Sequence, residues 1–379
     1  MPGLQDGPAP ESLDLFVPGR LCLFGEHSDW AGSMRKYNPD ISHGLTLVVT
    51  TEQGLFATAR RRDDRKLVLK TSAPGASSKS ITLDLDDEDG LFELASEGSF
   101  WSYAAGTAYK LSVEWHVGGL ELDNHRTTLP VKKGLSSSAA FCVLLARSFN
   151  RVYDLGLTVR GEMAVAYEGE RLTPSQCGRM DQAVAFGRAP ALMKYDGDFL
   201  KVESAALGCP LHLVLVDLRA GKDTVTILQG LQAAYPHPET AAHRRLLAAL
   251  GAENVAEIRD RVLPAMARGD AAEIGRAMVA AQWRFDRAAG PLCPSQLGEA
   301  GSPVLHRVLA WPALQPLLLG GKGVGSQGDG TAQLLCRDAE AQRRVCDILS
   351  RDLQLECVPF TVPATGQLNG ASAPNGTHA

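Results

Sequence analysis

The spacing of hydrophobic and polar residues divides the chain into a strand-rich first part and a remainder in which helices and strands mix. Short apolar or alternating runs between turn residues predict strands at 21–24, 44–51, 55–60, 67–69, 81–85, around 119–122, at 211–217 and near 355–361. Longer periodic or apolar segments predict helices at 93–111, 136–150, 159–171, 271–287 and 339–353. Because the strands and helices do not alternate as βαβ units, we expect an α+β fold with a lobe boundary near residue 200.

The composition agrees with a globular chain of two lobes. The 379 residues are 45% hydrophobic and 21% charged, with a formal net charge of -5. This balance offers no basic surface of the kind that binds nucleic acid or an anionic membrane. Eight cysteines without a CxxC pair indicate reduced thiols. Since the sequence shows no signal-peptide pattern and no apolar run of roughly 18 residues, we expect a cytoplasmic protein. We expect it to be a monomer or a homodimer. Residues 1–11 and 364–379 are expected to be disordered.

The sharpest chemical signal is the segment from Pro130 to Ala140, which reads Pro-Val-Lys-Lys-Gly-Leu-Ser-Ser-Ser-Ala-Ala and leads into an apolar helix. Glycine lets the backbone approach an anion, and the free N–H groups and dipole of a helix N-terminus favour phosphate. One serine would cap the helix, so three exceed that need. The segment therefore predicts a phosphate-binding loop. It is not a Walker A loop, since the chain has no GxxxxGK[ST] pattern.

A second segment, Val17–Trp30, contains a short apolar strand that ends at Gly25. Glu26, His27 and Asp29 follow within four residues. Their hydrogen-bonding side chains on one turn suit a polyhydroxylated ligand, because carboxylates accept from pairs of hydroxyls. A polar surface turn is the simpler alternative.

Three other features are candidates for ligand contact. Residues 320–330 hold six glycines in eleven positions, so their backbone can lie against a ligand or against the phosphate loop. Asp181, within Cys177–Gln182, enters an apolar stretch and is a candidate acid or base. Lys222 follows the 211–217 strand and is a candidate contact for an acidic or phosphate group of the substrate.

In this order and spacing, these segments resemble the GHMP kinase family, which groups galactokinase, homoserine kinase, mevalonate kinase and phosphomevalonate kinase. Residues 134–140 are similar to the second motif of the family and residues 321–330 to its third. Gly25-Glu-His-Ser-Asp29 and Cys177–Gln182 are most similar to the galactokinases.

The resemblance covers roughly residues 15–360 and implies a two-lobed GHMP kinase fold. The N-terminal lobe, 12–200, would contain a part like domain 2 of ribosomal protein S5. The C-terminal lobe, 201–363, would be a ferredoxin-like α/β sandwich, and the active site would lie in the cleft between the lobes.

The resemblance also implies roles for the acceptor side of the site. Asp181 would accept the proton from the attacking sugar hydroxyl or orient it. Arg20 would hold Asp181 ionised and offset the charge that builds on the transferred phosphoryl group. Glu26, His27 and Asp29 would bind sugar hydroxyls.

On the nucleotide side, the resemblance implies that ATP phosphates are cradled by Gly134, Leu135, Ser136, Ser137, Ser138 and Ala139. Trp101 lies in a stretch similar to the family segment near the adenine. Ser138 and one carboxylate would hold Mg²⁺. Glu168 and Glu170 are the candidates, and residues two apart on a helix point about 200° apart, so only one serves. We favour Glu170, since Glu170-Arg171 matches a recurrent family pair.

The implied activity is transfer of the γ-phosphoryl group of ATP to a hydroxyl of a monosaccharide, most simply the anomeric C1 hydroxyl. Residues 33–43, however, form an insertion where galactokinases run almost directly into a glycine pair and a strand. This departure lies beside the sugar loop, so the sequence does not specify galactose. Two alternatives stay open: a GHMP kinase for a non-sugar acceptor such as mevalonate, and a sugar sensor that binds without turnover.

Overall fold

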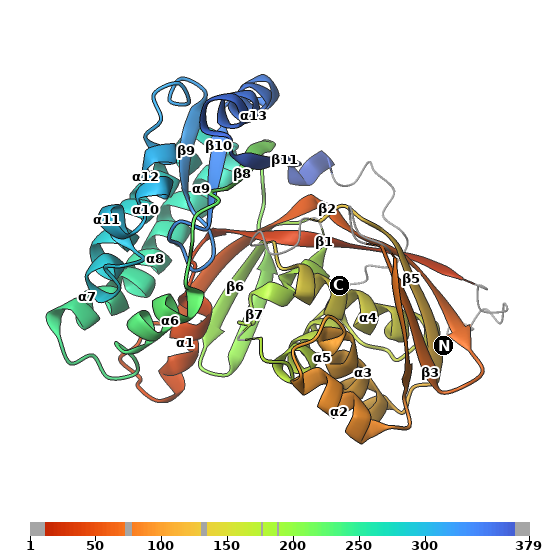
Figure 1. Ribbon diagram of the computed structural model, residues 1–379. Coiled ribbons are helices and arrows are strands. Elements are labelled where there is room, and N and C mark those ends of the chain that lie inside the picture. The colour runs from red at the N-terminus through yellow and green to blue at the C-terminus, as the bar shows by residue number, and fades with distance from the viewer. Residues whose placement is uncertain (1–11, 73–77, 130–134, 176, 188, 368–379) are drawn as a thin grey trace.

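The structure, a computed structural model, describes residues 12–72, 78–129, 135–175, 177–187 and 189–367 (Figure 1). The disorder expected at 1–11, and at all but the first four residues of 364–379, falls outside this range. Residues Thr365–Gln367 form the short 3₁₀ helix η5, whose Thr365 backbone N–H donates to Leu207 O at 2.8 Å.

Within the described residues, the N-terminal lobe is built on a seven-stranded sheet of β1 (Leu13–Phe24), β2 (Gly44–Arg62), β3 (Lys66–Thr71), β4 (Lys79–Asp84), β5 (Gly119–Thr127), β6 (Ala191–Asp196) and β7 (Phe199–Ser204). β2 is its spine. β1 pairs antiparallel with β2 along one edge, while β6 and then β5 pair with the other.

Four helices cover one face of this sheet (Figure 1): α2 (Glu88–Ser96), α3 (Ser102–Trp115), α4 (Ser137–Tyr153) and α5 (Val159–Arg171). Between Ala139 and Phe149, α4 is almost entirely buried, as its lack of a polar face predicted. The same lobe has three short helices: α1 (Ser28–Ser33), η1 (Met34–Lys36) and η2 (Asp181–Phe186), the last of which packs against α4, α5 and β1.

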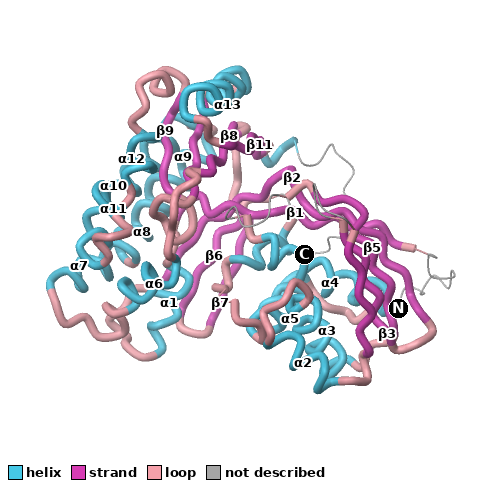
Figure 2. Tube along the Cα trace, in the orientation of Figure 1, coloured by secondary structure: helices cyan, strands magenta, loops and turns pink. Residues whose placement is uncertain are grey.

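The C-terminal lobe contains an antiparallel sheet in the order β11-β8-β10-β9, with β8 (Leu211–Asp217), β9 (Leu318–Gly323), β10 (Thr331–Cys336) and β11 (Glu356–Val362). Its helical segments are α6 (Thr224–Gln232), α7 (Ala241–Leu250), α8 (Ala252–Ala256), η3 (Glu257–Val262), α9 (Leu263–Arg268), α10 (Ala271–Ala289), η4 (Gly290–Leu292), α11 (Gly298–Gly301), α12 (Pro303–Leu309) and α13 (Ala339–Leu353). The two lobes and their connection are followed most easily in Figure 2.

The lobes share apolar and polar contacts. Ala31 of α1 belongs to an apolar cluster formed otherwise by helices of the C-terminal lobe. Three buried side chains also bond across the seam: Gln333 Nε2 donates to Cys22 O at 2.8 Å, Asn254 Nδ2 to Leu45 O at 2.8 Å, and Ser28 Oγ to Leu250 O at 2.8 Å. These buried bonds fix how the lobes sit against each other.

The α+β, two-lobed fold expected from the sequence is confirmed, and the predicted helices at 159–171 and 339–353 have the expected bounds. The single helix predicted at 93–111 is wrong. α2 ends before Gly98, whose φ of 73° stops a helix, and α3 then starts at Ser102. The strands predicted at 44–51 and 55–60 are one strand, because Gly54 passes so close beneath Phe16 that β1 pairs along both halves.

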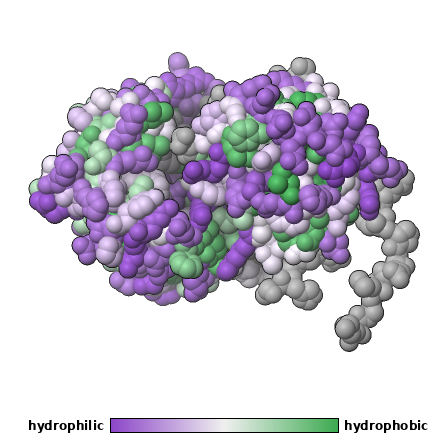
Figure 3. Space-filling model, turned by 90° about the horizontal axis from the view of Figure 1, so that it is seen from below, coloured by the Kyte–Doolittle hydropathy of each residue, from purple (hydrophilic) through white to green (hydrophobic). Residues whose placement is uncertain are grey.

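No helix in the described residues is long and apolar enough to cross a membrane. The face seen in Figure 3 is mostly hydrophilic, with separate apolar patches on each half. On this side of the molecule, the surface view therefore shows no apolar patch that extends over both halves.

Candidate active site

The centre of the candidate site joins residues from three distant segments. Arg20 of β1 forms an ion pair with Asp181 at the start of η2. Ser136 Oγ donates to the same Asp181 oxygen, Oδ1, at 3.1 Å. The Arg20 backbone N–H donates to Leu135 O at 3.2 Å, which ties β1 to the loop before α4. Burial would lower the pKa of Arg20, but the charge and hydrogen bond of Asp181 outweigh it, so the pKa is raised.

The N-terminus of α4 presents the serines expected to bind phosphate. Ser136 has φ 53°, a left-handed conformation that turns the chain into the helix. Ser137 and Ser138 follow and are half-buried, whereas Leu135 and Ala139 are buried. Gly134 lies outside the described residues. Free N–H groups at the start of a long buried helix suit an anion.

Glu170 and Glu168 have different surroundings. The Glu170 side chain is fully buried on α5, accepts from Gln182 Nε2 at 2.8 Å and is hydrogen-bonded by Ser138. Its other oxygen, Oε1, has no hydrogen-bond partner among the described residues. Burial, together with the charge of Asp181, raises the pKa of Glu170 to about 7. Glu168 instead points outward and pairs with Lys110 at 2.9 Å.

Asp29 and His27 line the part of the cleft next to Asp181. Asp29 is 6% exposed, and burial, with the charge of Asp181, raises its pKa to about 6. Gly178 lies against its carboxylate so closely that a Cβ there would be 1.8 Å from Oδ2.

His27 is held as a neutral ring. Its Nδ1 accepts from Trp30 Nε1 at 3.1 Å, and its ring stacks on Phe285 with centroids 5.5 Å apart. Burial lowers the pKa of His27 to about 4. In the neutral ring the proton therefore stays on Nε2, since Nδ1 is the acceptor.

Glu26 is not brought into the cleft. Its carboxylate forms an ion pair with Lys322 of β9, and both side chains are buried. Lys322 Nζ also donates to Gly323 O at 3.1 Å. The position next to His27 is therefore turned toward the C-terminal lobe, where the pair joins the lobes.

The cleft has a volume of about 950 Å³ and lies between the lobes. Asp29 and Asp181 lie on its N-terminal side, and α6 with Gly325 and Ser326 of the Gly-rich segment on the other. Its lining includes four residues of the 33–43 insertion: Ser33, Met34, Lys36 and Tyr37. The insertion noticed in the sequence is thus part of the wall that a ligand would meet.

Trp101 lies apart from this cleft, at the N-cap position of α3. It packs edge-on against Phe100, with centroids 4.8 Å apart, and Lys79 lies 4.4 Å from the Phe100 ring. The sequence did not single out Phe100 or Lys79. An aromatic pair with a cation beside it can receive a flat ring, so this corner is compatible with a base.

Sequence reasoning also missed Gln182, Lys322 and Phe285, which hold Glu170, Glu26 and His27 in place. Gln182 directly follows Asp181, and Lys322 lies within the Gly-rich segment, so proximity to a motif was the available signal. Phe285 gave none, because it is one apolar position of the amphipathic helix α10.

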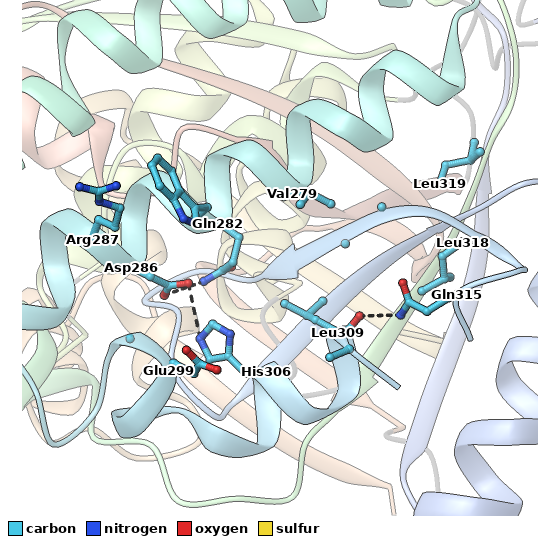
Figure 4. Close-up of a pocket in the computed structure, with 15 residues that line it drawn as sticks. Val279, Gln282, Asp286, Arg287, Glu299, His306, Leu309, Gln315, Leu318 and Leu319 are labelled. Carbon is cyan, nitrogen blue, oxygen red and sulfur yellow. Dashed lines mark hydrogen bonds and ion pairs between the residues drawn. The ribbon is translucent and has the colours of Figure 1, made fainter. Parts of the chain in front are cut away.

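A second pocket, of about 590 Å³, lies between α10, α12 and β9 (Figure 4). Asp286 occupies its floor, 3.4 Å from His306 and 3.0 Å from Gln282 Nε2. Gln282 Oε1 accepts from Gly323 N at 2.7 Å, next to Lys322. Of the described residues predicted to contact ligand, only Gly320 and Gly321 of the Gly-rich segment line this pocket, and it shares no lining residue with the cleft.

Several known proteins are similar to this chain in sequence or in fold. Residues 102–188 match the GHMP kinases N terminal domain. Galactokinase of Pyrococcus furiosus is 26% identical over 292 residues, which are 70% of this chain and 75% of that protein. The chain spans about half the length of other galactokinases that it matches, such as 48% of the one from Streptococcus thermophilus.

Two solved structures share the fold over nearly the whole chain. Lactococcus lactis galactokinase, complexed with galactose, has a TM-score of 0.68 at 19% identity and covers 95% of both chains. Methanococcus jannaschii mevalonate kinase has a TM-score of 0.66 at 12% identity and covers 94% of this chain and 100% of its own.

The fold is that of the GHMP kinases, and residues 102–188 match the N-terminal domain of that family, so this chain resembles a kinase of the GHMP type. The curated relatives described above are galactokinases, and this chain is similar to them in sequence.

Proposed function

We propose that this protein is an ATP-dependent sugar kinase that transfers the γ-phosphoryl group to a hydroxyl of a monosaccharide. The anomeric C1 hydroxyl is the acceptor that we favour. One observation carries the proposal: Asp181, paired with Arg20 and bonded by Ser136, lies in the same cleft as the buried Asp29. A carboxylate that accepts a proton and a cation that balances phosphoryl charge are thus adjacent, next to a second carboxylate that accepts from hydroxyls.

In this mechanism, Asp181 takes the proton of the acceptor hydroxyl as that oxygen bonds to the γ-phosphorus. The bond between the γ-phosphorus and the bridging oxygen breaks, and ADP leaves with the bond electrons. Arg20 fixes the position of Asp181 and offsets the charge that develops on the transferred group. Asp29 and the Nε2–H of His27 orient the sugar through its other hydroxyls. Most of the catalytic effect is positioning and charge stabilisation, as in phosphoryl transfer generally.

The nucleotide and metal would lie at the start of α4. The amides and hydroxyls of Ser136, Ser137 and Ser138 would receive the phosphates, with Trp101 toward the base. Ser138 and Glu170 suit Mg²⁺, because Glu170 Oε1 is buried without a partner among the described residues and the Ser138 side chain hydrogen-bonds the same carboxylate group. Mg²⁺ prefers one or two protein oxygens with water and phosphate completing its shell, and when bound it would neutralise phosphate charge.

The proposed role of Asp181 as proton acceptor can be tested by substitution. Asp181→Asn keeps the shape of the side chain but cannot accept the proton, so kcat should fall by roughly 10²- to 10⁴-fold. Binding of ATP, measured by calorimetry, should stay close to that of the wild type. Asp352→Asn is the matched control, because Asp352 pairs with Arg351 on the surface of α13. Unchanged turnover in Asp181→Asn would remove this residue from the mechanism.

The acceptor class is tested by ADP release over a panel of monosaccharides, uronic acids, mevalonate and amino-acid alcohols. Turnover of a sugar supports the proposal. Turnover of mevalonate or an amino-acid alcohol without any sugar contradicts it and selects the non-sugar alternative. Binding of a sugar without ADP release selects the sensor alternative.

A further inference from the structure

One wall of the cleft is formed by cations from three different elements. Lys36 comes from η1, Arg171 ends α5, and Arg179 lies in the loop before η2. We call these three residues the basic wall. Arg179 Nη1 donates to the backbone O of Asp198 at 2.7 Å, and Lys36 Nζ lies 3.0 Å from the carboxylate of the same residue. The guanidinium groups of Arg171 and Arg179 lie 5.9 Å and 5.3 Å from the ring centroid of Tyr167. The three cations therefore form one continuous strip.

The protein neutralises only part of this charge. Lys36 is paired with Asp198. Within the described residues, however, the contacts of Arg171 and Arg179 are with the Tyr167 side chain and a backbone carbonyl, and neither guanidinium has a carboxylate partner. Two guanidinium groups thus face the cleft with their charge-assisted hydrogen-bonding capacity largely unused.

The basic wall is distinct from the expected phosphate loop. Of the described residues that line the cleft, none belongs to the N-terminus of α4. The wall is made instead by the 33–43 insertion, by the end of α5 and by the loop that leads to Asp181. It therefore faces the acceptor, not the nucleotide phosphates.

A further cation approaches from the opposite lobe. The side chain of Lys222 packs against the Gly-rich segment so closely that a Cβ on Gly330 would lie 2.8 Å from Nζ. Burial lowers the pKa of Lys222, and no carboxylate among the described residues forms an ion pair with it. Its charge acts on His27, which lines the cleft. An anion in the cleft would offset the cost of burying this cation.

We propose that the acceptor of this kinase is an anionic sugar, whose carboxylate or phosphate ester is held by Arg171 and Arg179 while its reacting hydroxyl faces Asp181. This inference rests on the proposed sugar-kinase function and specifies its substrate class. Guanidinium groups match the planar geometry of a carboxylate or phosphate and bind it through paired N–H bonds. A neutral sugar would leave both groups without a charged partner.

The test compares matched acceptors on the full-length wild-type protein. ADP release is measured for galactose, glucose and mannose, for the uronate of each, and for the 6-phosphate of each. We expect kcat/KM for one anionic form to exceed that of its parent hexose by about tenfold or more, the effect of one charge-assisted bond. The better anion identifies the carboxylate or the phosphate ester as the source of the charge. Preference for a neutral hexose overturns this inference and leaves the sugar kinase standing. Absence of turnover with every sugar overturns both.

Variants assign the preference to the basic wall. Arg179→Gln and Arg171→Gln should each lower the ratio of anionic to neutral kcat/KM by about tenfold. Arg276→Gln is the matched control, because Arg276 is an exposed arginine of α10 that pairs with Glu273, and it should leave the ratio unchanged. Arg179 also bonds Asp198 O, so thermal unfolding is checked first; should that variant misfold, Arg171→Gln carries the test. An unchanged ratio in a folded variant would overturn the assignment.

Discussion

At the scale of single residues, the site is marked by buried carboxylates whose pKa is raised. Glu170 and Asp29 lie close to Asp181, and burial raises the pKa of each, to about 7 and about 6 respectively. Burying an ionisable group without complete compensation costs free energy, and such groups concentrate where a ligand later supplies the missing partner. For Glu170 that partner would be Mg²⁺, and for Asp29 the hydroxyls of the acceptor.

This cost gives a pH-dependent prediction for Glu170. Its pKa is raised from 4.5 in the unfolded chain to about 7 in the folded one, so the folded state holds its proton more tightly. Wild-type stability should therefore fall, relative to Glu170→Gln, as pH rises from 4.5 to 7, and then level off. Chemical denaturation at several pH values in a chelator measures it. Parallel curves for the wild type and Glu170→Gln would contradict the pKa assignment.

The sequence located residues whose chemistry is carried by a local motif. Asp181, Arg20 and Ser136 were found this way, and the structure brings them together. It could not show that Glu26 turns away from the cleft, because its partner Lys322 is 296 residues further along the chain. A pairing at that distance depends on how the lobes meet, which no local pattern encodes.

At the scale of elements, the C-terminal lobe depends on close contact between α10 and β9. Gly275 of α10 and Gly320 of β9 let the two backbones touch: a Cβ on Gly275 would lie 2.3 Å from Leu319 O, and one on Gly320 would lie 2.0 Å from Gly275 O. β9 also carries Lys322, so this packing sets the depth of the interlobe ion pair.

Gly275→Ala should therefore destabilise the protein by about 1–3 kcal/mol, because the methyl group meets a backbone carbonyl that cannot move aside cheaply. Thermal or chemical unfolding measures the loss. Gly221→Ala is the control, since a Cβ at Gly221 has nothing within 4 Å and should change stability by less than about 0.5 kcal/mol. Equal effects of the two substitutions would refute the close-contact argument.

Elements with strong periodicity and a cap were predictable. Helix 159–171 has an amphipathic pattern and a Thr158 side chain that accepts from Gly161 N. The hairpin of β6 and β7 was missed, although an alternating run on each side of Asp196-Gly197-Asp198 was a usable signal. Gly197, with φ 60°, makes that turn.

At the scale of the whole molecule, a buried ion pair holds together the two lobes that form the cleft. Glu26 and Lys322 form a buried ion pair across the lobes, and a further hydrogen bond links Gly323 to Gln282 on α10. The sequence predicted two lobes with a cleft between them. It did not show that α1, from the N-terminal lobe, packs among helices of the C-terminal lobe, because that contact arises only when the lobes dock.

Lys322→Met should leave Glu26 as a buried charge without its partner and destabilise the protein by about 3–5 kcal/mol. The double variant Glu26→Gln with Lys322→Met should recover most of the loss, since no charge is then left buried. A double-mutant cycle by chemical denaturation measures both effects. Lys201→Met, in the exposed pair with Glu203, is the control and should cost about 1 kcal/mol or less. A small effect of Lys322→Met would show that the pair is not closed in solution.

The same ion pair constrains how this protein can change over time. A substitution at Glu26 or at Lys322 alone leaves an uncompensated charge in the seam, so either single change is selected against before the other can follow. The two positions, 296 residues apart, should therefore covary. Related sequences should keep both charges or have lost both, and few should keep only one.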